Sequence, residues 1–439
     1  MEEQNINDTT NQQIQNSTVT LEEMNLQINK AKKKGRVQGV WISIIIVLLI
    51  VLAAFVIKIS KWISEGTIYG HILGTLGGHV VNSEVIDKAD ELYNLIDAIY
   101  LEDIDKDKLR EGIYKGLLEG LEDPYSVYYD KEEFAELMED STGVFEGIGA
   151  MLQQDPDTKK IKVVRPIKNS PAKEAGILAE DVLVSVDGEN ISGQDINVVV
   201  SKIRGPKGSS VEIGVRRNGK KNIITYDIVR DEVVSESVEY EMKENQIGYI
   251  MITEFAEQTG KQFKQALSAL QKQNMQSLIV DLRSNGGGSV ATSVEIADMF
   301  VKEGVIVSIK DKNGMNNVYE DKGDENYLTI PCVLLVDGNT ASASEILTGC
   351  LMDYGIATVI GTQTFGKGIA QDVIPLDDNT GVKITSAKYY SPKGINIHGV
   401  GFEPDIVVEW DYEKYTEDGT DNQIEAAINY LEYGNVEGK

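Results

Sequence analysis

Three hydroxyl residues stand close together where an apolar run, predicted to be a buried strand, passes through a polar turn into a helix: Thr340, Ser342 and Ser344. A hydroxyl at the start of a helix faces unpaired backbone N–H groups and the positive end of the helix dipole. That environment stabilises a developing oxyanion, as nucleophilic catalysis requires. Serine and threonine are also common helix caps, so the spacing alone leaves a nucleophile and three structural caps as open alternatives.

A run of three glycines forms the second candidate site. Gly286, Gly287 and Gly288 follow the apolar stretch SLIVDLR and precede a predicted helix. Consecutive glycines allow several backbone N–H groups to turn toward one point. Such a loop could hold an oxyanion or a phosphate, and a plain connecting loop is the alternative.

Lys367 lies between two glycines after the predicted strand ATVIG. Gly361, Gly366 and Lys367 fit the spacing of a phosphate-binding P-loop, but Gly368 replaces the residue that would bind magnesium. The following residues also lack a helical pattern, which disfavours a nucleotide site. A lysine in an apolar setting loses hydration, which lowers its pKa and makes it a usable base. A solvated loop lysine is the structural alternative.

The scarcity of histidine and cysteine limits the kinds of catalytic and metal sites that the chain can form. With three histidines, of which His71 and His79 lie near the hydrophobic segment described below, a Ser-His-Asp triad would depend on His398. A Ser-Lys pair is the natural alternative for a serine hydrolase. Two cysteines, Cys332 and Cys350, exclude a multi-cysteine zinc site and a disulfide framework, and we expect both thiols to be buried. The net charge of −28 argues against a nucleic-acid partner.

Residues 40–59 are predicted to be a single transmembrane helix, because 40–57 carry no charge and are long enough to cross a bilayer. An uncleaved anchor is favoured over a signal peptide or a buried core helix, since 39 residues precede the segment. Residues 1–39 read as a disordered tail. The basic residues before the segment outnumber those after it, which places the N-terminus in the cytoplasm and the rest outside the cell membrane: Lys30, Lys32, Lys33, Lys34 and Arg36 against Lys58 and Lys61.

The periodicity of the remaining chain divides it into four parts. Residues 84–140 show helical spacing, and their apolar stripe could pair two copies into a homodimer. Residues 141–231 contain short β-rich runs with one short helix, typical of a small β domain. Strands and helices alternate over residues 232–410, as in an α/β layered fold, and residues 411–439 form a helical segment.

Several of these stretches together resemble the C-terminal processing peptidases, also called tail-specific proteases. The similarity covers roughly residues 84–432 and rests on these motifs: NTASASEI, TFGKGIAQ, DLRSNGGG, SPAKEAGILAEDVLVSVDGENISG, LEDPYSVYYD and GVGFEPDI. It implies a multidomain α/β and α+β protein, with a PDZ domain at 141–231 and a crotonase-like α/β serine-protease core at 232–410. It implies peptide-bond hydrolysis without a metal or organic cofactor.

The resemblance also assigns catalytic roles. It selects Ser342 rather than Ser344 as the nucleophile, and Lys367, which lies 25 residues further on, as its base. Gln371, four residues after the lysine, would orient it. Asp353 is the counterpart of an auxiliary acidic residue that some members use.

The resemblance further implies two sets of backbone donors. Ala343 with Gly287 or Gly288 would form the oxyanion hole, in a loop where Gly286 replaces the more frequent proline or serine. The PDZ module would bind the C-termini of protein or peptide substrates by strand addition, and Arg204 stands where a regulatory arginine is expected. A catalytically inactive, membrane-bound PDZ scaffold is the rival interpretation. The residues implied for the peptide-binding loop are Gly147, Ile148, Gly149 and Ala150.

Overall fold

The computed structural model describes residues 24–26, 30, 80–323 and 327–437. The chain divides after Asp105 into two compact units. In the first unit, helix α3 (Ser83–Ile99) begins where the Asn82 side chain accepts a hydrogen bond from the Val85 N–H. None of its residues is buried, and most of its large apolar side chains are exposed: Val85, Ile86, Leu92, Leu95 and Ile99.

The predicted transmembrane helix at residues 40–59 lies outside the described residues. Among the residues that are described, no helix is long and apolar enough to cross a membrane.

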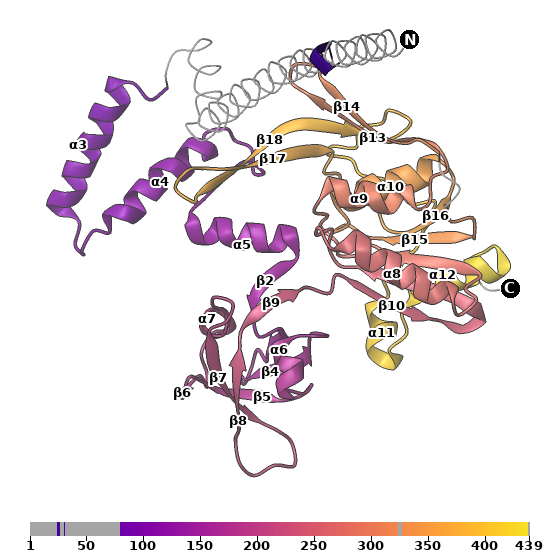
Figure 1. The fold of residues 1–439 in the computed structure, drawn as a ribbon, viewed down its shortest axis with the longest axis horizontal. Helices are drawn as coiled ribbons and strands as arrows, with labels where there is room; N and C mark the ends of the chain where they lie inside the picture. The colour runs from indigo at the N-terminus through magenta and orange to yellow at the C-terminus, as the bar shows by residue number, and fades with distance from the viewer. Residues whose placement is uncertain (1–23, 27–29, 31–79, 324–326, 438–439) are drawn as a thin grey trace, which may run out of the picture. The chain divides into compact units, whose positions relative to one another are not determined.

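The second unit begins with α4 (Lys106–Glu119), β1 (Val127–Tyr129) and α5 (Lys131–Thr142) (Figure 1). Asp130 and Glu133 form a capping box that fixes the start of α5. The helices confirm the periodicity found in the sequence, whereas β1 interrupts them as a short strand that the helical pattern does not predict.

The β-rich part confirms the short-strand pattern, but it contains two short helices, α6 and α7, where the sequence pattern predicted one. Its main sheet has the order β3-β4-β5-β7-β8, with β6 on β5, so within the described part of the chain one side of β3 is an unpaired sheet edge. A separate two-stranded ribbon joins β2 to β9. The elements are β2 (Val144–Gly147), β3 (Ala150–Gln154), β4 (Ile161–Pro166), α6 (Pro171–Ala175), β5 (Val182–Val186), β6 (Glu189–Asn190), α7 (Ile196–Ile203), β7 (Ser210–Arg216), β8 (Ile224–Val229) and β9 (Asp231–Val234).

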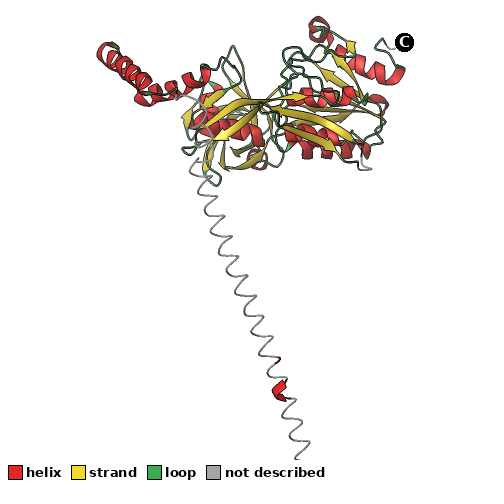
Figure 2. Cartoon of the chain, turned by 90° about the horizontal axis from the view of Figure 1, so that it is seen from above, coloured by secondary structure: helices red, strands yellow, loops and turns green. Residues whose placement is uncertain are grey.

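The α/β part is built on a six-stranded sheet of order β10-β11-β12-β15-β16-β19. The strands from β11 to β19 are parallel, and β10 is antiparallel to β11. Helices α8, α9 and α10 cover one face, and α12 covers the other. Helices lie on both sides of the strands in Figure 2. The elements are β10 (Val238–Met242), β11 (Ile247–Ile252), α8 (Thr259–Gln271), β12 (Ser277–Asp281), α9 (Val290–Asp298), β15 (Cys332–Val336), α10 (Ala343–Asp353), β16 (Ala357–Gly361), β19 (Ile406–Val407), α11 (Tyr412–Asp418) and α12 (Asn422–Tyr433).

Strand β12 shows how the sequence determines this layering. All five of its residues are buried, as its continuous apolar run predicts. Leu278 and Val280 pack into the core shared with α8, α9 and α10, while Ile279 packs into the core under α12. The alternation along the strand therefore supplies both faces of the sheet.

A second sheet has the order β1-β18-β13-β14, with β17 also paired to β18. Helices α9 and α10 pack against its strand β13, so they lie between the two sheets (Figure 1). The elements of this sheet that follow β1 are β13 (Gly304–Asp311), β14 (Asn316–Asp321), β17 (Ile369–Pro375) and β18 (Gly381–Tyr390).

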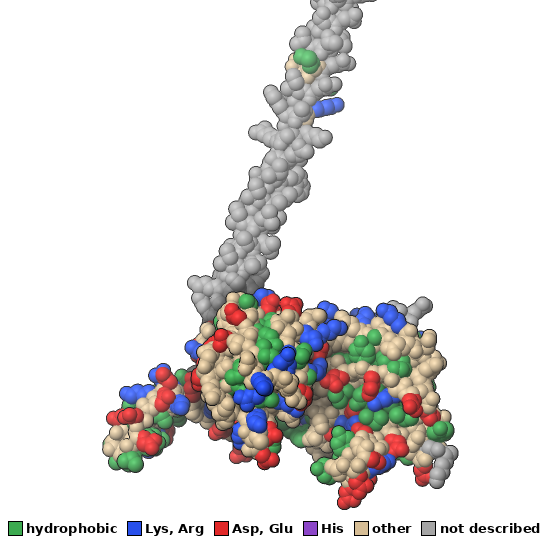
Figure 3. Space-filling model, turned by 90° about the horizontal axis from the view of Figure 1, so that it is seen from below, with side chains coloured by type: hydrophobic (Ala, Val, Ile, Leu, Met, Phe, Trp, Pro, Cys, Tyr) green, Lys and Arg blue, Asp and Glu red, His purple; other side chains and the backbone are tan. Residues whose placement is uncertain are grey.

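Acidic and basic side chains are interspersed over the face drawn in Figure 3.

Candidate active site

Three loops that carry the candidate residues leave neighbouring parallel strands at the same edge of the large sheet. The glycine loop follows β12, the hydroxyl turn follows β15, and the Lys367 loop follows β16. Carboxyl ends of parallel strands meet at one edge, where α/β proteins place their sites. The topology thus brings together segments that are up to about 80 residues apart in the sequence.

The three hydroxyls of the turn have different surroundings. Thr340 Oγ1 donates to the Leu282 carbonyl at 2.9 Å and accepts from the Asp337 N–H. Ser344 Oγ donates to the Asn285 carbonyl at 3.0 Å, and both residues are fully buried. Ser342 is partly exposed at the start of α10. Two of the hydroxyls therefore hold the turn together, and Ser342 is the one that a substrate can reach.

The Ser342 backbone has an unusual conformation. Its φ of 56° and ψ of −115° lie outside the regions that residues with a Cβ normally adopt. Such strain persists where surrounding contacts determine it, and it is frequent at active sites. The Ser342 carbonyl accepts from the Tyr389 hydroxyl at 3.2 Å and from the Glu345 and Ile346 N–H groups.

Glu345 lies at the centre of the candidate site, although the sequence pattern did not single it out. Its side chain is fully buried, and one carboxylate oxygen accepts from both the Ser342 N–H (2.9 Å) and the Lys367 N–H (2.8 Å). The two backbone nitrogens consequently lie within about 6 Å of each other. A serine followed three residues later by glutamate is a capping-box pattern, and this was the signal that could have identified Glu345.

The other carboxylate oxygen of Glu345 extends the same network. It accepts from the Thr364 hydroxyl at 2.6 Å and from the Gly366 N–H at 2.7 Å. A buried charge requires such compensation, because an unpaired carboxylate would carry a large desolvation penalty. Glu345 therefore fixes the hydroxyl turn and the lysine loop relative to each other through four hydrogen bonds.

Asn285 joins the glycine loop to the hydroxyl turn. Its side chain donates to the Ile252 carbonyl at 2.8 Å and accepts from the Gly287 N–H at 2.9 Å. Its backbone carbonyl accepts from the Ala341 N–H at 3.0 Å. Since the Gly287 amide is already engaged, it is not a free oxyanion donor in this structure.

Gly288 and Ala343 are the remaining candidates for the oxyanion hole. Within the described residues, neither backbone N–H makes a hydrogen bond. The glycine loop lies tightly against the hydroxyl turn: a Cβ added to Gly287 (φ 104°) would lie 2.8 Å from the Ser342 Cβ and 2.9 Å from the Ala343 nitrogen. Only glycine permits this approach at that backbone angle.

Lys367 is half-buried beside this turn. Burial lowers the pKa of its amine below the ordinary value, and the charge of Lys383 lowers it further, whereas Asp123 and Glu345 act in the opposite direction. Its Nζ lies 5.0 Å from the centre of the Tyr125 ring. The amine is thus partly shielded from water, which favours its neutral form.

Gln371 lies in β17, opposite Thr385 of β18 and next to a bulge. Its Nε2 atom is buried and has no hydrogen-bond partner among the described residues. The structure contains no described hydrogen bond between Gln371 and the Lys367 amine. The side chain is near the lysine loop in sequence and retains a free donor.

Asp353 lies at the far end of α10, about 16 Å along the helix from Ser342. Its carboxylate accepts from the Lys393 N–H at 2.9 Å and faces the Lys393 amine. This contact holds the turn after β18, and no described hydrogen bond or ion pair joins Asp353 to Ser342 or Lys367.

His398 is exposed in the turn that packs on the lysine loop, where a Cβ added to Gly368 would lie 2.5 Å from the His398 nitrogen. No described hydrogen bond links its side chain to Ser342. The P-loop alternative fails as well, because the residues after Lys367 form strand β17 and not the helix that would bind a phosphate.

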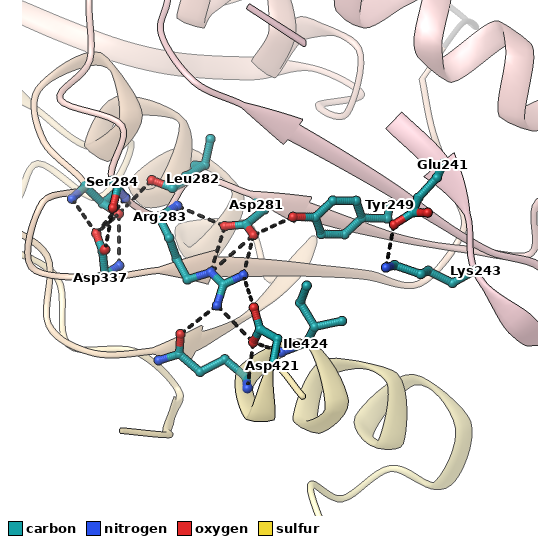
Figure 4. A network of polar contacts seen from close by, with 12 residues as sticks. Glu241, Lys243, Tyr249, Asp281, Leu282, Arg283, Ser284, Asp337, Asp421 and Ile424 are labelled. Carbon is teal, nitrogen blue, oxygen red and sulfur yellow. Dashed lines mark hydrogen bonds and ion pairs between the residues drawn. The ribbon is translucent and has the colours of Figure 1, made fainter. Parts of the chain in front are cut away.

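A polar network anchors the base of the glycine loop (Figure 4). The Arg283 guanidinium donates to the Asp281 carboxylate (2.6 Å), the Asp421 carboxylate (2.8 Å) and the Gln423 side chain (2.9 Å). Burial alone would lower the pKa of Arg283, but these carboxylates raise it above its ordinary range. Asp281 also accepts from the Tyr249 hydroxyl at 2.7 Å. The network connects the loop to the N-terminus of α12.

The candidate peptide-binding loop directs its carbonyl groups into its own domain. The Ile148 carbonyl accepts from the Ala172 N–H, and the Gly149 carbonyl accepts from the Ile167 N–H and the Ser170 hydroxyl. Within the described residues, the Ile148 and Gly149 N–H groups make no hydrogen bond. These two donors lie between Gly147, which ends β2, and Ala150, which begins the edge strand β3.

Arg204 caps the C-terminus of α7 and lies beside this loop, with its Cα 4.0 Å from the position of a Cβ added to Gly147. Its guanidinium is 2.5 Å from the Glu139 carboxylate of α5 and 5.5 Å from the centre of the Phe145 ring. Burial raises the pKa of Glu139, and the Arg204 charge opposes that shift.

Comparisons with known proteins agree with this organisation. The sequence matches the family models "Peptidase family S41" at residues 246–408, "PDZ domain" at 162–217 and "Activating protease CtpB N-terminal domain" at 55–133. It is 38% identical to the carboxy-terminal processing protease CtpB of Bacillus subtilis over 330 residues, 74% of this chain and 68% of the relative. It is also 38% identical to CtpA of the same organism over 345 residues, 78% of this chain and 73% of the relative. The chain therefore belongs to peptidase family S41 and is a serine-type peptidase related to the carboxy-terminal processing proteases.

Proposed function

We propose that the protein is a membrane-anchored endopeptidase that cleaves peptide bonds through an acyl-enzyme on Ser342. Ser342 Oγ attacks the substrate carbonyl while Lys367 takes its proton, and Gln371 orients the lysine. The N–H groups of Ala343 and Gly288 hold the oxyanion. Lys367 then returns the proton to the departing amine, and water releases the acyl group.

One observation carries this proposal: the distribution of hydrogen bonds within the hydroxyl turn. Thr340 and Ser344 use their hydroxyls to hold backbone carbonyls, whereas Ser342 is partly exposed. Its backbone is tied through the Glu345 carboxylate to the loop that carries Lys367. A half-buried lysine with a lowered pKa beside a strained serine supports a Ser-Lys mechanism.

The test compares two serine variants in the full-length protein. Ser342→Ala should abolish cleavage of a quenched fluorogenic peptide and labelling by a serine-directed phosphonate. Ser344→Ala should retain both, because the Asn285 carbonyl keeps its bond from Ala341 and the lost hydroxyl contributes about 0.5–1.5 kcal/mol to stability. Equal loss of activity in the two variants would refute Ser342 as the nucleophile. Absence of labelling in the native protein would favour the inactive scaffold.

We infer that the PDZ domain captures the C-terminus of a protein or peptide. The unpaired edge of β3 can accept an added strand, and the free N–H groups of Ile148 and Gly149 can bind a terminal carboxylate. Amidation of a bound peptide's C-terminus should weaken its affinity by at least tenfold in a fluorescence-anisotropy titration. Equal affinity of the acid and the amide would contradict carboxylate capture.

We also propose a single membrane crossing at residues 40–59, with the N-terminus in the cytoplasm and the protease outside. The apolar run and its flanking charges support this arrangement. A protease added to intact, wall-permeabilised cells should digest the C-terminal part, and digestion only after lysis would refute the orientation.

The exposed apolar side chains of α3 support a homodimer, which analytical ultracentrifugation in detergent tests.

A further inference from the structure

The motif LEDPYSVYYD presents an aromatic ring to Lys367. The Lys367 Nζ lies 5.0 Å from the centre of the Tyr125 ring, within the range of about 6 Å at which an aromatic face attracts a cation. Both side chains are half-buried. Among the described residues the Nζ atom makes no hydrogen bond, and the ring face is a direct contact that can stabilise its charge.

The turn that carries Tyr125 is held rigidly. Asp123 accepts from the Tyr125 N–H at 3.1 Å and from the Ser126 hydroxyl at 2.6 Å, while its carbonyl accepts from the Ser126 N–H. Pro124 occupies the second position of this turn, which its fixed φ favours. The sequence Asp-Pro-Tyr-Ser is thus a turn that fixes the place of the tyrosine.

The same turn is attached to the sheet that contains Gln371. Ser126 is buried, and its hydroxyl accepts from the Thr385 N–H of β18 at 3.0 Å. Immediately afterwards, β1 pairs with β18 in an antiparallel register from Val127 to Tyr129. The Tyr125 backbone consequently has little freedom relative to the strand pair β17–β18.

Three charged groups of the described residues act on the Lys367 amine. Lys383 on β18 disfavours its charged form, whereas Asp123 on the turn and Glu345 on α10 favour it. The Glu345 carboxylate is already occupied by four donors, and Asp123 by the donors of its own turn. The Tyr125 face therefore supplies stabilisation that neither carboxylate supplies through a direct hydrogen bond.

We propose that Tyr125 is a positioning residue for the base: its ring stabilises the charged form of Lys367 and thereby sets the pH at which the lysine releases its proton. This inference rests on the proposed role of Lys367 as the base. It also gives the Asp-Pro-Tyr-Ser turn a function that is separate from packing.

The test replaces Tyr125 in the full-length protein by phenylalanine, 4-fluorophenylalanine and 3,4,5-trifluorophenylalanine. Fluorination removes negative charge from the ring face and leaves its shape almost unchanged. From phenylalanine to the trifluoro ring, the apparent pKa of kcat/KM should fall by about 0.5–1 pH unit. That shift corresponds to about 0.7–1.4 kcal/mol, at 1.36 kcal/mol per unit.

The matched control places the same series at Tyr129, whose ring lies 5.5 Å from the Nζ of Lys383. There the apparent pKa of kcat/KM should stay constant, because the Tyr129 ring faces Lys383 and the base is paired with Tyr125. The midpoint of thermal unfolding, measured on each variant, identifies any that is misfolded.

A second readout is independent of activity. The pKa of Lys367 is measured from the 13C chemical shift of its Cε in Ser342→Ala protein, with Lys367→Met for assignment, and it should fall along the series at residue 125. An unchanged lysine pKa across that series would overturn the proposal. A shift in the NMR titration without a shift in kcat/KM would support the ring contact and refute Lys367 as the base.

Discussion

Replacing Glu345 by glutamine tests whether the buried carboxylate aligns the nucleophile with the base. Each carboxylate oxygen accepts from at least one backbone N–H: Ser342 and Lys367 on one side, Gly366 on the other. A glutamine has one NH2 group, so in either orientation this group faces a backbone donor. At least one charge-assisted hydrogen bond is lost, and a buried N–H is left unpaired.

The expected loss of stability follows from the number of hydrogen bonds that the substitution removes. A hydrogen bond to a charged group contributes about 1.5–3 kcal/mol, so Glu345→Gln should destabilise the protein by at least that amount. The repelled donors belong to the two loops that carry Ser342 and Lys367. A displacement of about 1 Å in catalytic groups can cost about 100-fold in rate, so we expect kcat to fall by about that factor while KM changes little.

The assay measures kcat and KM with a fluorogenic peptide, together with urea unfolding. Glu425→Gln is the matched control, because Glu425 forms an exposed ion pair with Lys414 on the surface. This control should change stability by less than about 1 kcal/mol and leave kcat unaltered. If folded Glu345→Gln protein keeps a kcat within threefold of the native value, the carboxylate does not position the site. A rise in KM at constant kcat would instead assign it to substrate binding.

Three further predictions concern Lys367, the hydrogen-bond network of Arg283 and the two cysteines. Because folding lowers the pKa of Lys367, the protonated lysine destabilises the folded protein at low pH, and this destabilisation disappears as pH rises toward 10.5. The inactive variant Lys367→Met should therefore have a higher unfolding temperature than the native protein at pH 7. A difference in unfolding temperature that does not narrow by pH 9.5 would contradict this. Asp421→Asn should lower the urea-unfolding free energy by about 2 kcal/mol or more, because it weakens two bonds from Arg283, and an unchanged midpoint would refute the role given to that network. Burial raises the pKa of the Cys332 and Cys350 thiols to about 12, so a disulfide reagent at pH 8 should modify them only after denaturant is added; rapid reaction of the folded protein would show that they are accessible.

Local signals in the sequence were sufficient for much of the architecture. The continuous apolar run SLIVDLR predicted a strand buried on both faces, and β12 is buried at every residue. The sequence also predicted a change from helical spacing to short β-rich runs after residue 140, and in the structure α5 ends at Thr142 and β2 begins at Val144. Both features depend on hydrophobic patterning, which is a property of neighbouring residues and can be read without the fold. The expectation of buried cysteines held for the same reason.

Contacts between distant segments required the tertiary structure. The sequence left Thr340, Ser342 and Ser344 as equivalent candidates until a family resemblance separated them, whereas the structure distinguishes them by partners that lie up to 59 residues away. Asp353 matched a family position, but its carboxylate faces Lys393, 40 residues further along the chain.

The sequence by itself determined the kind of chemistry available to this protein: a hydroxyl turn, a glycine loop and a lysine, with almost no histidine. The tertiary structure decided how these parts meet, because parallel strand order brings three loops to one edge and a buried Glu345 joins two of them. It also decided that the Tyr125 ring faces the lysine amine. Proton affinity depends on burial and on nearby charges in three dimensions, so residue spacing alone does not specify it.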